Sequence, residues 1–424
     1  MELSKMGIGT TRLQNIDEQF PVQDILVQSG QLVQYASGIY GYNNVPLLVQ
    51  ENIKRIIVEE LNKAGCSQVT LPTLQPRELW EKSKRWNTYV DDGVMLTIET
   101  QKGDFCVAPT AEEAVVEFTT KKVKSYKDLP VIPFQIGDKY RNELRARGFL
   151  LRGKCFVMMD AYSFDADIDG LVVSYDKVKQ AYFRIFERLG LKVIPVVADN
   201  GDMGGKKSEE FMMLSEIGED TILYDKETGI GLNTEVLEKE NYKEYLKEEY
   251  GITSIDNLER KRAVELGHIF QLGDRYSESM DATFTDKDGI EKPFYMGCYG
   301  IGVSRVLATI YESNMIRNRK GNPAGASLPK SIAPYPLHIV YKDDKKDIAD
   351  ELYNFLQANG VETIIDDRPD ISLGARIADC SILGTPYLVV IGDKTVKGTF
   401  NIEDTKTGEK YDMEKEKIID FLKQ

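Results

Sequence analysis

A cluster of basic side chains stands out in a chain that is acidic overall. The sequence has 68 Asp and Glu against 54 Lys and Arg, a net charge of −14. Nevertheless, five basic residues gather between positions 141 and 154: Arg141, Arg145, Arg147, Arg152 and Lys154. Guanidinium groups bind phosphate oxygens through paired hydrogen bonds, so this grouping favours phosphate recognition. Arginines of a solvated loop are the plainer alternative.

A second candidate site is the stretch GCYGIGVSR at 297–305, where closely spaced glycines precede Arg305. Glycine lets a backbone approach a ligand closely, as in nucleotide-binding loops. No strand leads into a G-x-G-x-x-G here, and no Gly-Lys-Ser follows. Taken alone, the stretch indicates an anion site about as well as it indicates tight strand-to-helix packing with Arg305 in a surface ion pair.

The segment PTAEEAVVEF contains a third group of polar residues. Thr110 followed by Glu113 three residues later predicts a capping box at the start of a helix. A capping box explains Glu113, but it leaves Glu112 without a role. Glu112 is therefore a candidate for a functional carboxylate.

The hydrophobic pattern predicts the elements that position these residues. Apolar residues recur at helical spacing from Val49 to Ala64, with Pro46 near the start and Gly65 after the end, and a strand follows that stops at Pro72. FQIGDKYRNE and KCFVMMDAYSF read as strands on either side of the arginine loop. They predict an antiparallel hairpin. A helix over DKVKQAYFRIFERLG and a strand over LKVIPVVAD come next.

The pattern changes after NPAGASLPKSIAPYP, a loop rich in proline and glycine. Strands and helices alternate from LHIVY to PYLVVIG, which predicts a small βαβ domain with mainly parallel strands. We therefore expect one domain over residues 1–330, in which 226–262 form a short charged connector, and a second domain over 335–424.

Composition excludes several classes of protein. The five cysteines form no C-x-x-C pair, which argues against a zinc knuckle and a disulfide framework and favours a reducing cytoplasm. The chain lacks a signal segment and any run of about eighteen apolar residues, so we expect a cytoplasmic protein without a membrane partner. His268 and His338 are the only histidines, so catalysis should depend on positioning and charge more than on proton transfer.

Four motifs in this order resemble those of class II aminoacyl-tRNA synthetases: Thr-x-Glu at 110–112, Arg-x-Glu at 141–143, Arg-x-x-x-Phe at 152–156, and Gly-x-x-Gly-x-Gly-x-x-Arg ending at 305. LQPRELWEKSKRW, LLRGKCFVMMDAYSFD, GHIFQLGDRYSESMDATF and GCYGIGVSR resemble the bacterial type of prolyl-tRNA synthetase. The similarity runs from about Ser29 to about Asp393. It implies an α+β catalytic domain built on an antiparallel sheet flanked by helices, and a C-terminal α/β anticodon-binding domain.

The resemblance implies that ATP is the substrate, bent on the sheet with Mg²⁺ on its phosphates, and that no tightly bound cofactor or protein metal cage is needed. Arg141 would lie at the α-phosphate, and Arg152 with Arg305 would hold the γ-phosphate end. Glu143 would accept a hydrogen bond from the adenine amino group, and Phe156 would stack on the purine. The implied ATP-binding residues are Arg141, Glu143, Arg152, Phe156, Glu265 and Arg305, with Arg141 and Arg305 as the catalytic pair.

For proline, the resemblance implies that Thr110 and Glu112 hold the charged secondary amine, because an ammonium removed from water needs a carboxylate partner. For His268, a structural role is an equal alternative. The other implied proline-binding residues are Arg141, Met158, Asp160, His268, Phe270 and Cys298.

Several positions depart from the family pattern. Ala111 and Glu209 stand where histidine is usual, Cys155 stands where glutamate is usual, and Gly148-Phe149 is inverted relative to the usual Phe-Gly. None of these departures removes an arginine assigned to ATP, so we expect adenylation to persist.

The resemblance also implies a homodimer and an RNA partner, the proline tRNA. Arg368 and Arg376 are candidates for reading anticodon bases, with salt-bridged surface residues as the alternative. The short connector replaces the editing domain of longer relatives, which predicts that this chain does not clear alanyl-tRNA.

Three functions remain open from the sequence. The first is ligation of proline to tRNA. The second is adenylation with a different amino acid or acceptor, and the third is non-catalytic tRNA binding.

Overall fold

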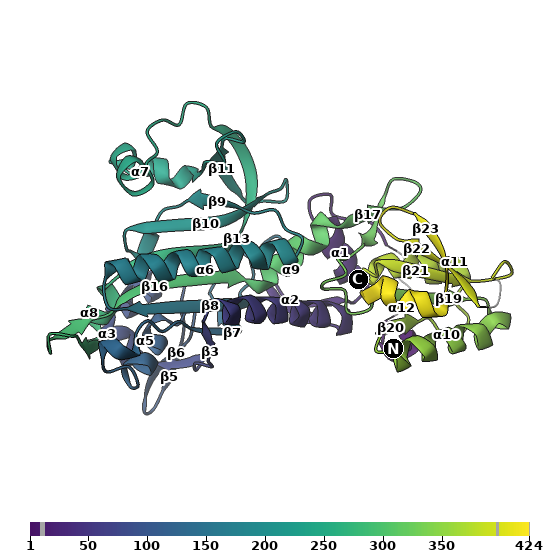
Figure 1. Cartoon of the computed structure of the whole chain (residues 1–424), viewed down its shortest axis with the longest axis horizontal. Helices are drawn as coiled ribbons and strands as arrows, with labels where there is room; N and C mark the ends of the chain where they lie inside the picture. Colours follow the sequence, from purple (N-terminus) through teal and green to yellow (C-terminus); the bar gives the residue numbers. More distant parts are fainter. Residues whose placement is uncertain (9–12, 396–397, 424) are drawn as a thin grey trace. The chain divides into compact units, whose positions relative to one another are not determined.

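The computed structural model describes residues 1–8, 13–395 and 398–423. The chain divides into two compact units, one formed by 54–306 and the other by 1–53 together with 307–424. Residues 1–53 and 307–330, which we expected in the catalytic domain, therefore lie in the same unit as 335–424. Figure 1 labels the elements in chain order.

A nine-stranded sheet in the order β10-β9-β12-β11-β13-β16-β8-β7-β3 forms the centre of the 54–306 unit. Its strands are β3 (Ser67–Gln68), β7 (Pro133–Tyr140), β8 (Cys155–Asp165), β9 (Ile194–Val197), β10 (Lys207–Leu214), β11 (Asp220–Tyr224), β12 (Gly231–Asn233), β13 (Glu259–Gly273) and β16 (Tyr295–Gly302). β7 and β8 pair antiparallel, as do β8 with β16 and β16 with β13, which confirms the predicted hairpin and the antiparallel sheet.

The far end of this sheet closes on itself. β10 pairs with both β9 and β13. β12 pairs with β9 on one side and with β11 on the other, and β11 also pairs with β13. The predicted connector at 226–262 therefore supplies β12 and the start of β13, with the short helices η4 (Thr234–Glu238) and α7 (Tyr242–Tyr250) between them.

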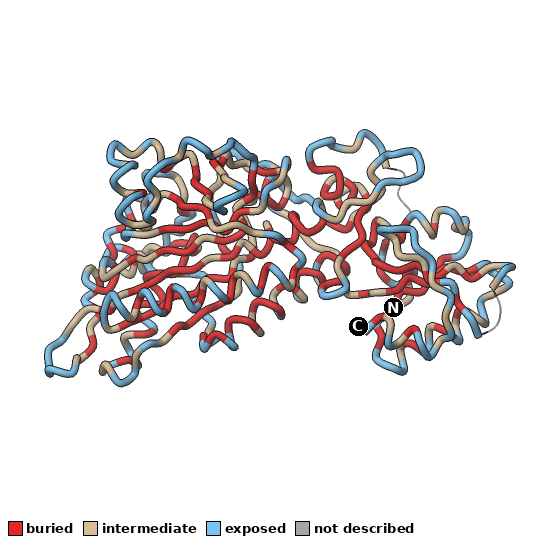
Figure 2. The backbone as a smooth tube through the Cα atoms, turned by 45° about the horizontal axis from the view of Figure 1, so that its top comes forward, coloured by how far each residue is buried: buried red, intermediate tan, exposed pale blue. Residues whose placement is uncertain are grey.

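Helix α6 (Ile168–Arg188) covers one face of the sheet. Asp167 caps its start by accepting from the Gly170 amide at 2.8 Å, and Leu171, Val178 and Ile185 recur one heptad apart on its buried face. α2 (Asn44–Lys63) matches the predicted helix, and Glu60 near its end accepts from Arg184 at 2.9 Å and from Arg188 at 2.7 Å, both on α6. Figure 2 shows the buried backbone running along the sheet strands.

A smaller three-stranded sheet carries the segments that precede the hairpin. It contains β4 (Leu74–Pro76), β5 (Leu96–Thr100) and β6 (Gly103–Val107). In the chain, α3 (Arg77–Lys82) and α4 (Trp86–Asp91) lie between β4 and β5, and α5 (Glu112–Thr120) follows β6. The predicted strand ending at Pro72 is wrong in extent, because Ser67–Gln68 joins the large sheet and Leu74–Pro76 joins the small one. α8 (Arg275–Ser279) and the hairpin of β14 (Thr283–Thr285) and β15 (Glu291–Pro293) complete this unit.

The predicted capping box is also wrong. Ala111 is the residue before α5 and provides no side-chain cap, while the Thr110 hydroxyl donates to Glu112 Oε2 at 2.6 Å. Glu113 is fully buried and accepts from Ser83 Oγ at 2.7 Å. Both glutamates of the first turn thus make tertiary contacts, and local spacing alone could not indicate this.

The other unit contains a five-stranded sheet in the order β20-β19-β21-β22-β23. β19 (Leu337–Tyr341) pairs parallel with β20 (Thr363–Ile365) and β21 (Tyr387–Ile391), whereas β22 (Thr399–Asp404) and β23 (Lys410–Glu414) add antiparallel. The expected parallel arrangement therefore holds for three strands. α10 (Lys346–Ala358), α11 (Leu373–Ile382) and α12 (Lys415–Lys423) accompany the sheet.

The same unit includes α1 (Pro21–Gln28), the hairpin of β1 (Leu32–Ala36) with β2 (Ile39–Tyr42), and the hairpin of β17 (Met315–Arg317) with β18 (Pro323–Ala326). α9 (Val303–Ser313) follows β16 directly. Among the described helices, none is long and apolar enough to cross a membrane.

Candidate active site

A cleft of about 900 Å³ lies within the 54–306 unit, and every residue predicted to bind ATP or proline lines it. These residues are Thr110, Glu112, Arg141, Glu143, Arg152, Phe156, Met158, Asp160, Glu265, His268, Phe270, Cys298 and Arg305. The structure thus brings together side chains from segments that are nearly 200 positions apart in the sequence.

The floor of the cleft follows from strand geometry. Side chains on a strand alternate between faces, so Phe156, Met158 and Asp160 of β8 point to the same side. His268 and Phe270 of β13 do the same. Because β16 lies between these two strands, three adjacent strands present one continuous surface.

The glycines before Arg305 have two separate roles. A side chain at Gly297 would come within 2.2 Å of the Tyr299 hydroxyl, so this glycine is required for packing. At Gly300, which lines the cleft, the atoms nearest to an added Cβ would be 3.9 Å away. A side chain there would cause no clash, but it would cover the floor of the cleft. Gly297 thus agrees with the packing interpretation, whereas the anion-site interpretation of this stretch stays a prediction.

Arg152 and Arg305, which are predicted to hold the γ-phosphate, are paired with carboxylates of the same cleft. Arg305 donates from Nε to the Leu151 carbonyl at 3.0 Å and from Nη1 to the Glu265 carbonyl at 3.0 Å, and it also pairs with the Glu265 carboxylate. Arg152 Nε donates to Glu143 Oε2 at 2.7 Å. Burial alone would raise the pKa of Glu265, but Arg305 and His268 outweigh it and hold this pKa well below its usual range. Glu265 is therefore an anion that fixes Arg305.

Arg141 is exposed at the mouth of the hairpin loop. Its guanidinium carbon lies 5.3 Å from the centre of the Phe156 ring, and its Nε donates weakly to the Pro109 carbonyl at 3.4 Å. The side chain thus lies between the predicted purine-stacking ring and the Thr-x-Glu segment.

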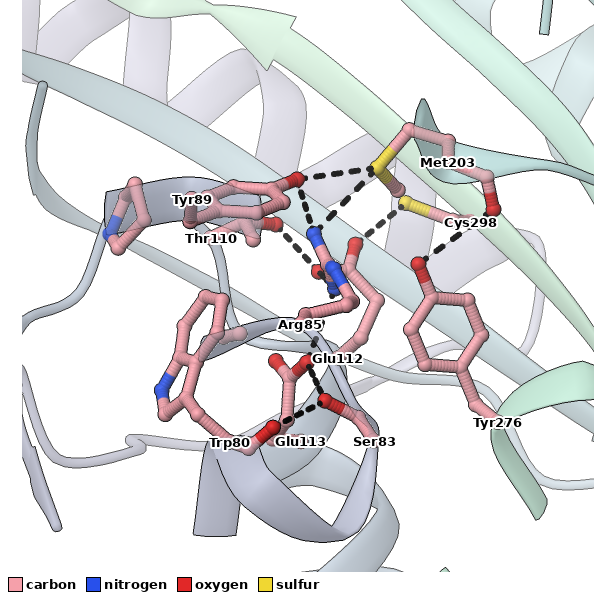
Figure 3. A network of polar contacts seen from close by, with 12 residues as sticks. Trp80, Ser83, Arg85, Tyr89, Thr110, Glu112, Glu113, Met203, Tyr276 and Cys298 are labelled. Atoms are coloured by element: carbon pink, nitrogen blue, oxygen red, sulfur yellow. Dashed lines mark hydrogen bonds and ion pairs between the residues drawn. The ribbon is translucent and has the colours of Figure 1, made fainter. Parts of the chain in front are cut away.

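Glu112 occupies the opposite end of the cleft, where it is fully buried. Thr110 Oγ1 donates to Glu112 Oε2 at 2.6 Å, and Cys298 Sγ donates to Oε1 at 3.2 Å. Arg85 Nη1 donates to Oε2 at 3.1 Å. Figure 3 shows these side chains converging on the carboxylate. The site thus holds a buried, strongly hydrogen-bonded anion.

Asp160, which lines the cleft, is held by side chains of β7 and β8. It accepts from Lys139 Nζ at 2.7 Å, from Gln135 Nε2 at 2.9 Å and from the Tyr162 hydroxyl at 3.0 Å. Burial raises the pKa of Asp160 although Lys139 opposes the shift. These contacts tie β7 to β8 at the predicted amino-acid site.

His268 is held on both sides. Its Nε2 lies 2.5 Å from Ser208 Oγ, its Nδ1 lies 3.4 Å from Glu265 Oε1, and its ring stacks on Phe270 with centres 3.9 Å apart. His268 therefore lines the cleft and also packs structurally, and its role in binding stays a prediction.

Sequence reasoning missed Arg85 and Glu210. Arg85 lies within the motif LQPRELWEKSKRW, but nothing in its spacing separates it from a surface arginine. Glu210, Glu265 and His268 each offer one side-chain atom that could bind a metal ion, and these three atoms lie within 4.8 Å of one another. Burial raises the pKa of Glu210 to about 7. The pairing of β10 with β13, which no local pattern predicts, places Glu210 opposite His268.

The residues that depart from the family pattern do not line the cleft. Among its described lining residues, none is Ala111, Cys155 or Glu209. Glu209 instead accepts from the Tyr175 hydroxyl at 2.8 Å and from Lys179 Nζ at 2.7 Å, both on α6. Glu209 thus fastens α6 to β10. Gly148 and Phe149 both adopt positive φ, 61° and 51°, in the loop of the hairpin.

Arg368 and Arg376 are buried in the other unit, with 7% and 4% of their surface exposed. Arg368 donates to both Asp366 and Asp379, with the Nη2 bond to Asp379 at 2.7 Å, and Arg376 Nη1 donates to the Tyr341 carbonyl at 3.2 Å. These contacts fasten α11 to the sheet. Arg368 forms salt bridges with Asp366 and Asp379, as the alternative expected, but both arginines are interior and not at the surface. Anticodon reading stays a prediction that these contacts do not support.

Comparison with known proteins agrees with the geometry. Residues 96–314 match the class II core domain of tRNA synthetases (G, H, P, S and T), and residues 335–424 match an anticodon binding domain.

Two full-length relatives are both named proline-tRNA ligase. The one from Sulfurimonas denitrificans is 35% identical over 443 positions, covering 100% of both chains. The one from Aquifex aeolicus is 30% identical over 572 positions, covering 100% of this chain and 99% of the relative.

Two solved structures of a prolyl-tRNA synthetase from Cryptosporidium parvum share the fold. The complex with L-proline and AMP has a TM-score of 0.75 at 17% identity and covers 98% of this chain and 77% of that one. The complex with halofuginone and AMPPNP has a TM-score of 0.73 at 16% identity, covering 95% and 74%. By its family domains and its full-length relatives, the chain belongs to the proline-tRNA ligase family of class II tRNA synthetases.

Proposed function

We propose that this chain attaches proline to its cognate tRNA in two steps, through a prolyl-adenylate made from ATP. The observation that carries the proposal is one cleft with arginines at one end and a buried, ionised carboxylate at the other. The names of the full-length relatives support the same reaction.

In the first step, the proline carboxylate attacks the α-phosphorus of ATP, the bond to the β-phosphate oxygen breaks, and pyrophosphate leaves. Arg141 stabilises the charge that develops on the α-phosphate, because a preorganised guanidinium favours the transition state over the ground state. Arg152 and Arg305 hold the γ-phosphate end, Glu143 accepts from the adenine amino group, and Phe156 stacks on the purine.

Thr110 and Glu112 orient the proline by accepting from its secondary ammonium, while Met158, Phe270 and Cys298 border the ring. In the second step, a ribose hydroxyl at the tRNA 3′ end attacks the prolyl carbonyl and AMP leaves. No protein nucleophile is required, which fits a cleft whose single histidine is held by Ser208 and Glu265.

The residues present also fit Mg²⁺. This ion takes oxygen ligands and is bound through one or two carboxylates together with substrate phosphates. Glu265 and Glu210 would supply the carboxylates, and the ion would neutralise phosphate charge. The protein would thus contribute one or two carboxylates to the ion rather than a complete metal cage.

The partners follow from the same proposal. The tRNA is recognised in part by residues 335–424. A homodimer is supported by the exposed apolar side chains Val33, Tyr35 and Ile39 around the hairpin of β1 and β2. A cytoplasmic location is supported by the five cysteines, which are all free.

The experiment that tests the ligation is aminoacylation of a proline tRNA transcript with radiolabelled proline. Proline should accumulate on the tRNA only when ATP is present. Active adenylation of proline without any charging would instead favour a paralogue with a different acceptor, and absence of ATP turnover would favour the non-catalytic alternative.

A further inference from the structure

Arg85 lies buried behind the amino-acid end of the cleft, beside two adjacent carboxylates. Its Nη1 donates to Glu112 Oε2 and to Glu113 Oε1, each at 3.1 Å. Only 4% of the Arg85 side chain is exposed, and neither glutamate side chain is exposed at all. Figure 3 shows the guanidinium reaching both carboxylates of the first turn of α5.

Aromatic rings fix the guanidinium from the other sides. Its central carbon lies 4.4 Å from the ring centre of Tyr89 and 5.2 Å from those of Trp80 and Tyr276. Cation-π contacts of this kind stabilise a desolvated arginine without adding another carboxylate. The cation is thus held in one place, between these rings and the carboxyl groups of Glu112 and Glu113.

Glu112 and Glu113 receive different hydrogen bonds from their surroundings. Glu112 receives additional hydrogen bonds from Thr110 and Cys298, whereas Glu113 receives one from Ser83. Among the described residues, Glu113 Oε2 has no hydrogen-bond partner, which costs less for a neutral carboxyl than for an anion. Glu112 lines the cleft, and Glu113 does not.

The acid-base properties support this difference. Burial raises the pKa of Glu112, but Arg85 and the hydrogen bond from Thr110 outweigh burial, so this pKa lies below its ordinary value. Burial raises the pKa of Glu113 as well, and there the charge of Glu112 helps to outweigh Arg85, so this pKa lies above its ordinary value.

We infer that Arg85 is a positioning residue for amino-acid binding, which holds Glu112 ionised and directed into the cleft while Glu113 remains neutral behind it. The inference rests on the proposed function, in which Glu112 binds the proline ammonium. Two adjacent buried carboxylates would otherwise share a proton, and the cleft would lose part of the negative charge that a cationic substrate requires.

The experiment measures proline-dependent exchange between ATP and pyrophosphate by the full chain from pH 6 to pH 8.5. Arg85→Met should raise the KM for proline at least about tenfold at pH 7, because Glu112 then becomes partly protonated. The KM for ATP should stay within about twofold, since Arg85 makes no contact at the phosphate end.

The pH profile separates positioning from a merely structural role. Without Arg85, burial raises the pKa of Glu112, so the KM for proline should fall as pH rises, whereas the wild-type KM should change little. The other titratable groups that face Glu112 are Tyr89 of α4, Glu113 of α5, Asp160 and Tyr162 of β8, Tyr276 of α8 and Cys298 of β16. Only Glu113 is expected to share a proton with Glu112 in this range.

Three further variants separate the effects of Glu112, Glu113 and the Arg85 cation. Glu113→Gln imitates a neutral carboxyl and should leave the KM for proline and its pH profile unchanged. Glu112→Gln should raise the KM for proline at every pH. Arg85→Lys, which retains the cation, should recover most of the loss caused by Arg85→Met.

The inference is overturned if Arg85→Met leaves the KM for proline unchanged, or if it changes the KM for both substrates alike without dependence on pH. Should Arg85→Met fail to fold, the double variant Arg85→Met with Glu113→Gln removes one buried carboxylate and should show the same proline-specific loss. Failure of both proteins to fold would assign Arg85 a structural role and would also overturn the inference. Lack of proline-dependent exchange by the wild type would contradict the proposed function itself.

Discussion

At the scale of residues, the central observation is how the charged side chains of the cleft are arranged. Arg305 lies against Glu265 and Arg152 lies against Glu143, while Glu112 is buried at the opposite end. An arginine that is already oriented by a carboxylate loses little side-chain entropy when it binds phosphate. This arrangement supports the proposed site, in which the arginines bind phosphate and Glu112 binds a cation.

Arg141 provides the sharpest test at this scale. Replacing it by lysine should lower kcat for proline-dependent exchange by about 100-fold, because the planar guanidinium at the α-phosphate stabilises charge that develops only in the transition state. The KM for proline should change much less. Steady-state kinetics of the exchange reaction measures both values.

Arg55→Lys is the matched control, because Arg55 is an exposed arginine of α2 that pairs with Glu59. It should behave as the wild type. Equal loss of activity in the two variants, or a kcat of Arg141→Lys close to that of the wild type, would remove Arg141 from the chemistry.

At the scale of elements, the sequence predicted α2, α6 and the hairpin of β7 with β8, because long periodic segments with clear ends carry their own signal. It did not predict the closed arrangement of β9 to β13, because those pairings join segments up to about 60 positions apart through contacts that no local spacing encodes. The missed role of Glu210 has the same cause.

The candidate site was predictable for a different reason. The motif residues Arg141 to Phe156 and Arg305 were identified by resemblance, and the strand pairing that unites them was confirmed. Arg85 and Glu113 were not assigned, since a buried ion pair between α5 and the segment before α4 is visible only once the helices are packed. For Glu113, the local capping interpretation was plausible and wrong.

His338 of β19 allows an element-scale prediction about pH. The side chain is fully buried, and burial lowers its pKa to about 4. Because the unfolded chain binds the proton more tightly, the stability of this unit should be complete above about pH 6.5 and should decline as pH falls toward 4, by about 3 kcal/mol in total.

His338→Leu should remove this dependence without changing the carboxylates that also titrate. The test compares the midpoint of thermal unfolding for the two proteins at pH 7.5, 6 and 5. The wild type should lose stability relative to the variant as pH falls. Parallel curves for the two proteins would contradict the assignment.

At the scale of the whole molecule, the chain combines the class II core and the anticodon-binding domain in 424 residues. The alignment with the Aquifex aeolicus relative spans 572 positions, so that relative carries sequence that this chain lacks. Here, residues 226–262 form only η4, α7 and parts of neighbouring strands, which close the sheet. They provide structure for the core but no separate domain.

We therefore predict that this chain does not hydrolyse alanyl-tRNA. Incubation of the purified protein with proline tRNA that carries labelled alanine should release alanine at the rate of the uncatalysed reaction. Prolyl-tRNA formation in the same preparation serves as the control for active protein. Release well above the uncatalysed rate would show that hydrolysis takes place on one of the two units described here.

The proposed function is tested most directly by exchange between ATP and pyrophosphate, measured with each of the twenty amino acids in turn. We predict exchange that proline stimulates well above every other amino acid, since the proposed site joins arginines that bind phosphate to a buried carboxylate, Glu112, suited to a cyclic ammonium. Exchange stimulated more strongly by another amino acid, or no exchange with any of them, would contradict it.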